Sequence, residues 1–268
     1  MTAPTAGRVT IEEGVVFGRG GGRELRCDVF TPPGGARNAP AVLLVHGGGW
    51  REGDRTQLRG YGILLGREGF VCVASEYRLA PGATWPAQIH DVKAAIRWMR
   101  ANAGELGINA DQIAIEGNSA GGHLALMAAG TPNMPEFEGD GGNPGVGTEV
   151  AAVIAFYAPA RLDASNQVIR DLLGSASADA ASAASPLTHV SPSFPPTMLI
   201  HGNRDDVVPV GESFRMYDAL DRAGVPVELH IFAGEPHAFD SGSLLGRQSA
   251  GLMRAFLARY VAVPQPSA

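Results

Sequence analysis

The stretch that most constrains this chain is GNSAG at residues 117–121, because it places a serine between a predicted strand and a predicted helix. Residues 112–115 before it are apolar and rich in β-branched side chains, which is typical of a buried strand. Residues 123–129 after it are rich in helix formers, and Gly130 follows as a helix end. A G-x-S-x-G sequence in this setting predicts a sharp turn that holds Ser119 in a strained backbone conformation above a sheet.

The same turn predicts chemistry at Ser119. Gly117 and Gly121 flank the serine because side chains there would collide with the strand and the helix. The first N–H groups of a helix have no acceptor within it, and they favour negative charge near the helix start. We therefore expect Ser119 to be a nucleophile in a reaction that develops negative charge.

Strand-like and helix-like segments alternate along the rest of the chain, which predicts a mostly parallel, doubly wound α/β sheet. Residues 9–17 and 24–30, joined by a glycine-rich turn, predict an antiparallel N-terminal hairpin. Further strands are predicted at 41–45, 70–75, 112–115, 150–157, 197–200 and 227–232, and helices at 60–68, 86–103, 123–129, 211–222 and 243–261.

One domain is predicted over residues 1–268, since α/β domains often reach this length. Residues 158–196 have no clear pattern and an alanine- and serine-rich centre, and a segment this long is usually a functional loop or lid. We expect a small lid-like insert there, no large cap, and a disordered tail at 263–268.

The charge and the cysteines exclude several classes of protein. A net charge of −6 argues against nucleic acid and anionic membranes as partners. Residues 1–8 lack the apolar core of a signal peptide and no run reaches transmembrane length, so a cytoplasmic location is expected. Cys27 and Cys72 lie in predicted strands and are expected to be buried free thiols.

A serine hydroxyl becomes a good nucleophile only when a neighbouring base takes its proton. In sets built on this kind of turn, the acid and then the histidine follow the serine along the chain. His237 lies in a loop after the last predicted strand, where its side chain can reach over the edge of the sheet, and His189 is a remote alternative. Asp205 and Asp206 follow strand 197–200. Spacing favours Asp205, and the alternative role for either is to cap the next helix.

Acyl transfer also needs donors for the oxyanion, and backbone N–H groups serve best. The glycines at 47–49 offer such donors without side chains, and the N–H of Ala120 completes the set. The alternatives are a tight turn or a phosphate-binding loop, but no Walker lysine follows and the G-x-G-x-x-G spacing is missing there. The chain also lacks an H-E-x-x-H pattern, so we expect neither a metal nor a cofactor.

Six motifs together resemble the bacterial esterases of the hormone-sensitive-lipase-like group, and especially the compact feruloyl-esterase-like BD-FAE group. They are HGGGW (46–50), EYRLAP (76–81), WPAQIHDVKAAIRWMRANA (85–103), GNSAGGH (117–123), SPLTHVSP (185–192) and HGNRDDVVP (201–209). The resemblance extends from about residue 10 to 262 and implies an α/β-hydrolase fold.

The resemblance also assigns roles to single residues. It implies that Ser119 is the nucleophile, His237 the base and Asp205 the acid. It also implies an oxyanion hole at Gly48, Gly49 and Ala120. The chain departs from the pattern at Asn118, where aspartate is frequent, and this should change local hydrogen bonding.

Aromatic residues near these motifs are predicted to bind substrate. Trp50 follows the oxyanion glycines and Trp85 opens a helix after the EYRLAP loop, with core packing as the alternative for both. Tyr77 and Asp91 are expected to organise loops.

The residues together predict a cofactor-free serine carboxylesterase that acts through an acyl-enzyme on short-chain acyl esters, aryl and acetylated-sugar esters included. The site is predicted to be open, and shallow on the acyl side. Two alternatives stay open: an aryl formamide hydrolase like kynurenine formamidase, and a non-catalytic ligand-binding module on the same fold. The predicted partner is a small-molecule ester, and the oligomeric state, a homodimer included, is left open.

Overall fold

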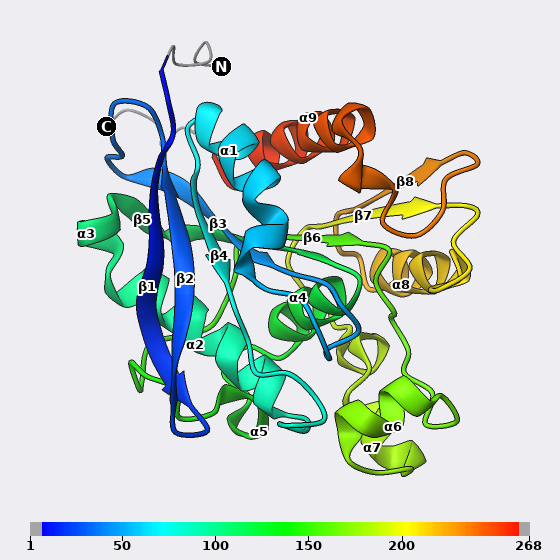
Figure 1. Ribbon diagram of the computed structural model, residues 1–268. Helices are drawn as coiled ribbons and strands as arrows, with labels where there is room; N and C mark the ends of the chain where they lie inside the picture. Colours follow the sequence, from blue (N-terminus) through cyan, green and yellow to red (C-terminus); the bar gives the residue numbers. More distant parts are fainter. Residues whose placement is uncertain (1–6, 263–268) are drawn as a thin grey trace.

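The computed structural model describes residues 7–262, and within them eight strands form one sheet in the order β1-β2-β4-β3-β5-β6-β7-β8 (Figure 1). Their bounds are β1 (Thr10–Gly20), β2 (Arg23–Thr31), β3 (Ala39–Val45), β4 (Val71–Ser75), β5 (Ile108–Asn118), β6 (Val153–Phe156), β7 (Thr197–Gly202) and β8 (Val227–Phe232). The β1–β2 and β2–β4 pairs are antiparallel, and all pairs from β4 to β8 are parallel. This arrangement confirms the predicted sheet and its N-terminal hairpin.

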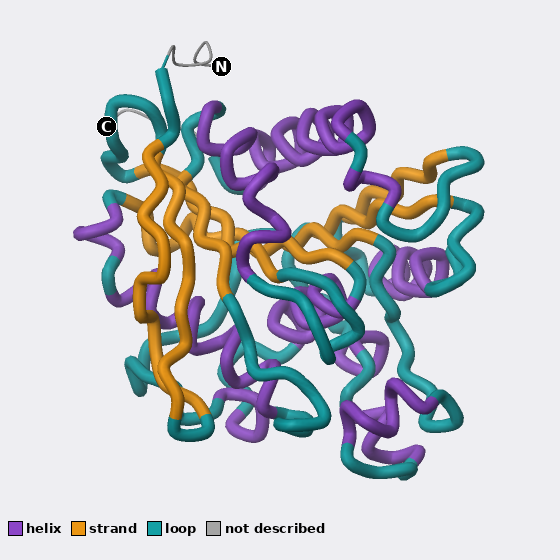
Figure 2. The backbone as a smooth tube through the Cα atoms, in the orientation of Figure 1, coloured by secondary structure: helices purple, strands orange, loops and turns teal. Residues whose placement is uncertain are grey.

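Helices cover both faces of the sheet (Figure 2). Helices α1 and α9 pack together on one face, while α2, α4 and α8 lie on the other. The α-helices are α1 (Arg59–Arg67), α2 (Ala87–Ala101), α3 (Ala103–Leu106), α4 (Ala120–Gly130), α5 (Pro135–Glu138), α6 (Gln167–Leu173), α7 (Ala178–Ala183), α8 (Gly211–Arg222) and α9 (Ser243–Tyr260). The 3₁₀ helices are η1 (Arg55–Leu58), η2 (Pro186–His189) and η3 (Phe239–Ser241).

Strand β3 shows why the sheet is covered on both sides. Its side chains alternate between the two faces: Leu43 and Val45 belong to one buried cluster, and Val42 and Leu44 to the other. All of them are buried, as expected for the continuous apolar run of a central parallel strand. Two cores therefore form, one under α2 and α4 and the other under α1 and α9.

The strand order reverses at β3, which has β4 on one side and β5 on the other. In open α/β sheets, ligands bind in the crevice outside the carboxyl ends of the strands at such a point. The glycines at 47–49 follow β3 and Ser119 follows β5, so the topology brings them to the same crevice.

The insert at 158–196 is more regular than the sequence pattern indicates, since it contains α6, α7 and η2. The side chains of Asn166 and Ser177 accept hydrogen bonds from N–H groups in the first turns of α6 and α7, and such caps stabilise short helices whose apolar pattern is too brief to detect. Cys27 and Cys72 are buried free thiols, as predicted. The predicted tail at 263–268 lies outside the described residues. Within the described part, no helix has the length and apolar character needed to span a bilayer.

Helix α1 carries three glycines that differ in what surrounds them. A Cβ on Gly62 would come within 2.8 Å of the Phe30 ring on β2, and one on Gly66 within 3.0 Å of the Val9 side chain. A Cβ on Gly60 would meet nothing within 4 Å. The first two glycines let α1 approach the sheet closely, whereas packing does not require the third.

We expect Gly62→Ala to lower the free energy of unfolding by about 1–3 kcal/mol, because the added methyl group overpacks the contact with Phe30. Gly251→Ala is the matched control in α9, where a Cβ meets nothing within 4 Å. It should raise stability by up to about 1 kcal/mol through helix propensity alone. Urea unfolding of both variants tests this, and equal stabilisation of the two would contradict the close packing of α1.

Candidate active site

Ser119 occupies the turn between β5 and α4 with φ 55° and ψ −117°, a strained conformation for a residue with a side chain. Its N–H donates to the carbonyl of Phe156 at 2.9 Å, and its carbonyl accepts the first helical hydrogen bond from His123 at 2.9 Å. The backbone is therefore held on both sides of the serine.

The glycines around Ser119 are required by close backbone contacts. A Cβ on Gly117 would lie 2.2 Å from the carbonyl oxygen of Gly121, and a Cβ on Gly121 would lie 2.0 Å from that of Val45. A Cβ on Gly47 would lie 2.9 Å from the carbonyl oxygen of Asn118. The loop after β3 thus lies directly against the serine turn.

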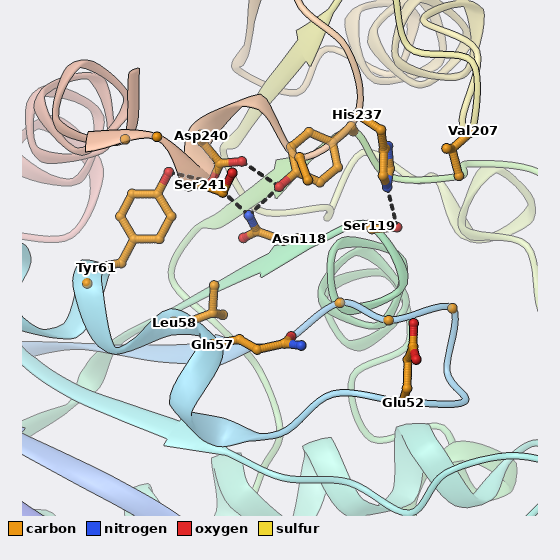
Figure 3. A pocket seen from close by; sticks show the side chains of 18 of the residues that line it. Glu52, Gln57, Leu58, Tyr61, Asn118, Ser119, Val207, His237, Asp240 and Ser241 are labelled. Atoms are coloured by element: carbon orange, nitrogen blue, oxygen red, sulfur yellow. Dashed lines mark hydrogen bonds between the residues drawn. The ribbon is translucent and has the colours of Figure 1, made fainter. Parts of the chain in front are cut away.

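The structure brings the three predicted triad residues together, and Figure 3 shows two of them, His237 and Ser119. His237 Nε2 lies 3.0 Å from Ser119 Oγ, and His237 Nδ1 lies 2.6 Å from Asp205 Oδ2. Because a carboxylate only accepts hydrogen bonds, Nδ1 is the donor, which leaves Nε2 free to accept the serine proton. This tautomer is the one that a general base needs.

Asp205 is held by donors on both of its oxygens. Oδ1 accepts the N–H groups of Val207 and Val208 at 2.9 and 2.8 Å. Oδ2 lies 2.6 Å from His237 Nδ1 and 3.2 Å from His201 Nε2, and the side chain has no exposed area. The carboxylate is therefore fixed in position before substrate binds. Asp206 is exposed.

His201, at the end of β7, was not singled out by its sequence position. Its Nε2 faces two acceptors, Asp205 and the carbonyl of Val208 at 2.8 Å, so this nitrogen carries the proton. Nδ1 accepts the hydroxyl of Ser213 at 2.7 Å, and burial lowers the pKa of His201. A neutral histidine thus orients the predicted catalytic acid. The HGNRDD motif contains His201, but only the fold shows which aspartate it contacts.

The loop expected to form the oxyanion hole is a tight turn beside Ser119. Gly48 and Gly49 have φ values of 109° and 58°, and Gly48 O accepts the N–H of Arg51 at 3.0 Å. Ala120 is the first residue of α4, so its N–H has no acceptor within the helix. Gly47 lies against Asn118 and Ser119, and Ala120 follows Ser119 directly, so the two segments that carry the predicted donors are next to the serine. Their role as an oxyanion hole stays a prediction.

Tyr77 and Asp91 organise loops, as predicted. The Tyr77 hydroxyl donates to the carbonyl of His46 at 3.0 Å, and the two rings stack with centroids 4.2 Å apart. Asp91 accepts the backbone N–H and the guanidinium of Arg78 at 2.8 Å. The first contact fixes the start of the glycine loop, and the second fixes the segment after β4.

Trp50 and Trp85 lie away from the triad. Both rings pack edge-on against His123, with centroid distances of 5.0 and 5.7 Å, and Trp50 is only 3% exposed. Neither is among the described residues that line the pocket at Ser119. Their placement matches the core-packing alternative and gives no support to a substrate contact. Burial lowers the pKa of His123 to about 4, so this ring is a neutral packing partner.

A second carboxylate, which is partly buried, anchors the loop that carries His237. Asp240 accepts hydrogen bonds from the hydroxyls of Tyr61 and Tyr157 at 2.7 and 2.6 Å, and from Asn118 Nδ2 at 2.9 Å (Figure 3). Asp240 lies three positions after His237 along the chain, so these bonds tie the His237 segment to β5, to the residue after β6 and to α1. Sequence reasoning missed this cluster.

The cluster explains the departure at Asn118. An amide can donate to Asp240, whereas an aspartate there would bring a second negative charge to within hydrogen-bonding distance. Glu116, two residues earlier on the same face of β5, is fully buried. Burial, and then the charge of Asp240, raise its pKa well above the ordinary value, which favours the uncharged acid.

A pocket of about 1170 Å³ opens beside Ser119. It is lined by the glycine loop, by η1 and α1, by Val168 of α6, and by the segment from His237 into α9. Much of the wall comes from elements on the α1–α9 face. The volume and lining of this pocket do not assign it to the acyl or the alcohol side of the ester, so a site that is shallow on the acyl side stays a prediction.

Comparisons with known proteins identify relatives of this chain. The family model described as BD-FAE matches residues 27–220. The chain is 37% identical over 261 residues to the probable carboxylic ester hydrolase LipM of Mycobacterium tuberculosis, covering 90% of this chain and 59% of that protein. It is 36% identical over 209 residues to the esterase LipC of the same organism, covering 73% and 50%. The chain thus spans only about half of the length of these curated relatives.

Solved structures match over nearly the whole chain. A truncated carbohydrate esterase from gut microbiota has a TM-score of 0.83 at 25% identity, over 96% of this chain and 100% of that one. The esterase Est2 of Thermogutta terrifontis has a TM-score of 0.82 at 28% identity, over 95% of each chain.

The two adjacent aspartates give a direct test of the site. Asp205→Asn should lower kcat by about 10⁴-fold, because an amide favours the wrong imidazole tautomer. Asp206→Asn should lower it less than about tenfold, since its side chain is exposed and the catalytic geometry would be intact. Steady-state kinetics on p-nitrophenyl acetate with both purified variants checks the ranking, and the reverse order would move the catalytic acid to Asp206.

Proposed function

This chain belongs to the BD-FAE family of α/β hydrolases, and on that basis we propose that it is a serine carboxylesterase acting through an acyl-enzyme. The observation that carries the proposal is the hydrogen-bonded line from Ser119 Oγ through His237 to Asp205, with distances of 3.0 and 2.6 Å. A strained serine turn, a base and a fixed acid are the parts that acyl transfer needs.

The proposed reaction has two halves. Ser119 Oγ attacks the ester carbonyl as His237 Nε2 takes its proton, and the carbonyl oxygen becomes an oxyanion that the N–H groups of Gly48, Gly49 and Ala120 stabilise. The carbon–oxygen bond to the alcohol then breaks, and the imidazolium of His237 returns the proton to the leaving alkoxide. Water repeats the attack on the acyl-enzyme with the same base, which releases the acid and restores Ser119. No step draws on a metal or a cofactor.

The residues around the triad support these proton transfers. When His237 becomes positively charged, Asp205 is 2.6 Å away to stabilise it, and the bonds from Val207, Val208 and His201 keep the carboxylate from turning. Asp240 holds the other end of the His237 loop through Tyr61 and Tyr157. Each of these interactions is made within the described fold, so little reorganisation is needed when charge develops.

We propose short acyl groups as substrates, with aryl or acetylated-sugar esters among them. The Thermogutta terrifontis esterase has been solved with propionate and with butyrate, and another structural neighbour is a carbohydrate esterase. In this chain, a Cβ on Gly49 would lie 3.7 Å from Val168 Cγ1 of α6, so the insert comes close to the proposed oxyanion loop in the manner of a small lid.

Rapid-mixing kinetics with p-nitrophenyl acetate tests the proposal. We expect a burst of nitrophenol of about one equivalent per active site, since the acyl-enzyme accumulates when deacylation is slow. Ser119→Ala should abolish the burst and lower kcat by about 10⁴- to 10⁶-fold, because triad members act as a unit. The exposed serine variant Ser193→Ala is the matched control and should behave like the wild type.

Two outcomes would contradict the proposal in different ways. Faster turnover of N-formylkynurenine than of any ester in a panel would make the enzyme an aryl formamide hydrolase. Wild-type protein that binds esters without releasing either product would make it a binding module.

A further inference from the structure

The pocket at Ser119 continues away from the triad between two helices, and this part is called the α1–α9 groove. Its walls are Leu58, Gly60, Tyr61 and Leu64 on one side and Ser243 and Gly246 on the other. Figure 3 shows Leu58 and Tyr61 on one wall facing Asp240 and Ser241 on the other, with Ser119 at the far end. The inference below rests on the proposed esterase function.

Gly60 is the residue that keeps the groove open. Residues 57, 60, 61 and 64 have the spacing of one helix face, and all four line the pocket. A Cβ on Gly60 would meet nothing within 4 Å, whereas Gly62 and Gly66 of the same helix are pressed against the sheet. Glycine is a poor helix former, so its presence at 60 lowers helix propensity without improving the packing of the protein. What it provides is space inside the groove.

The polar groups of Tyr61 and Asp240 on the walls of the groove are already paired. The Tyr61 hydroxyl donates to Asp240, and Asp240 also accepts from Tyr157 and Asn118, so the carboxylate is satisfied by protein donors. Leu58 is 6% exposed, and Leu64 is half-buried beside it. A ligand at this wall meets hydrocarbon and ring surface. Charged side chains, such as Arg247, are exposed at the rim.

The chemistry of the triad decides which end of the ester enters the groove. His237 must protonate the leaving alkoxide, so the alcohol oxygen has to lie next to His237 Nε2. The segment that follows His237 forms one wall of the groove, from Ala238 through Gly242 and into α9. The groove therefore begins where the alcohol portion begins.

We infer that the α1–α9 groove binds the alcohol portion of the ester and that, among the proposed substrates, it favours esters of apolar alcohols longer than ethyl, aryl alcohols included, over acetylated sugars. The acyl group then lies on the other side of Ser119, where a short chain suffices. Each methylene of the alcohol that becomes buried should improve kcat/KM by about fourfold, until the chain reaches the end of the groove.

The test measures kcat/KM by pH-stat titration for two series of esters. The first series varies the alcohol and consists of ethyl, butyl and octyl acetate. The second series varies the acyl group and consists of ethyl acetate, ethyl butyrate and ethyl octanoate. In wild-type enzyme, kcat/KM should rise along the first series. Gly60→Leu fills the groove, and it should lower the octyl-to-ethyl acetate ratio of kcat/KM by at least about tenfold. Gly60→Ala should give a smaller decrease in the same direction. Gly251→Leu adds the same side chain to an exposed glycine of α9 outside the pocket, and it should leave both series unchanged.

The outcomes distinguish failure of the inference about the groove from failure of the proposed esterase function. A Gly60→Leu effect confined to the ethyl ester series would assign the groove to the acyl group and overturn the inference. Equal ratios in Gly60→Leu, Gly251→Leu and wild type, with unchanged melting temperatures, would show that the groove binds neither part of the substrate. Failure of the wild-type enzyme to hydrolyse any of the esters would instead overturn the proposed function, and the inference with it.

Discussion

Everything at this site depends on the close backbone contact at the Ser119 turn. A residue with a side chain at φ 55° carries strain on the order of 1–3 kcal/mol, and it persists only where the surroundings leave no alternative. Here β3, β5 and α4 meet at Gly117 and Gly121, where a single added carbon would lie 2.0 to 2.2 Å from a carbonyl oxygen. The contact exposes the serine hydroxyl at the sheet edge. It also aims the start of α4 at the place where the oxyanion is proposed to form.

The carboxyl groups at this edge of the sheet have different hydrogen-bonding environments. Asp205 meets two backbone N–H groups and two histidines, and Asp240 meets two tyrosine hydroxyls and an amide. Glu116 is buried, and burial and the charge of Asp240 raise its pKa, which favours its uncharged form. An aspartate at position 118 would add another negative charge beside Asp240, so Asn118 serves the network better than the acid that is frequent there.

The sequence was sufficient to single out the three residues that the structure brings together as a hydrogen-bonded line, because each of them follows a strand within a recognisable local pattern. Ser119 lies in a strand–turn–helix motif, and Asp205 and His237 follow β7 and β8 directly. The groove could not be predicted in this way. Its walls join α1 to α9, and the hydrogen bond between Tyr61 and Asp240 links residues 179 positions apart. Trp50 and Trp85 show the converse case. They lie beside motifs in the sequence, but neither belongs to the described residues that line the pocket. Residues 158–196 contain short helices that depend on single capping side chains, which apolar periodicity does not reveal.

The most direct test of the account is to find which atom of the protein becomes covalently modified. Reaction of the wild-type enzyme with paraoxon, followed by intact-mass measurement and peptide mapping, should show one diethylphosphoryl group per chain, located on Ser119. Loss of activity should follow the growth of that adduct in proportion, because the organophosphate occupies the position of the acyl group. Complete inactivation with the adduct on another residue, or with Ser119 unmodified, would contradict the assignment of Ser119 as the nucleophile.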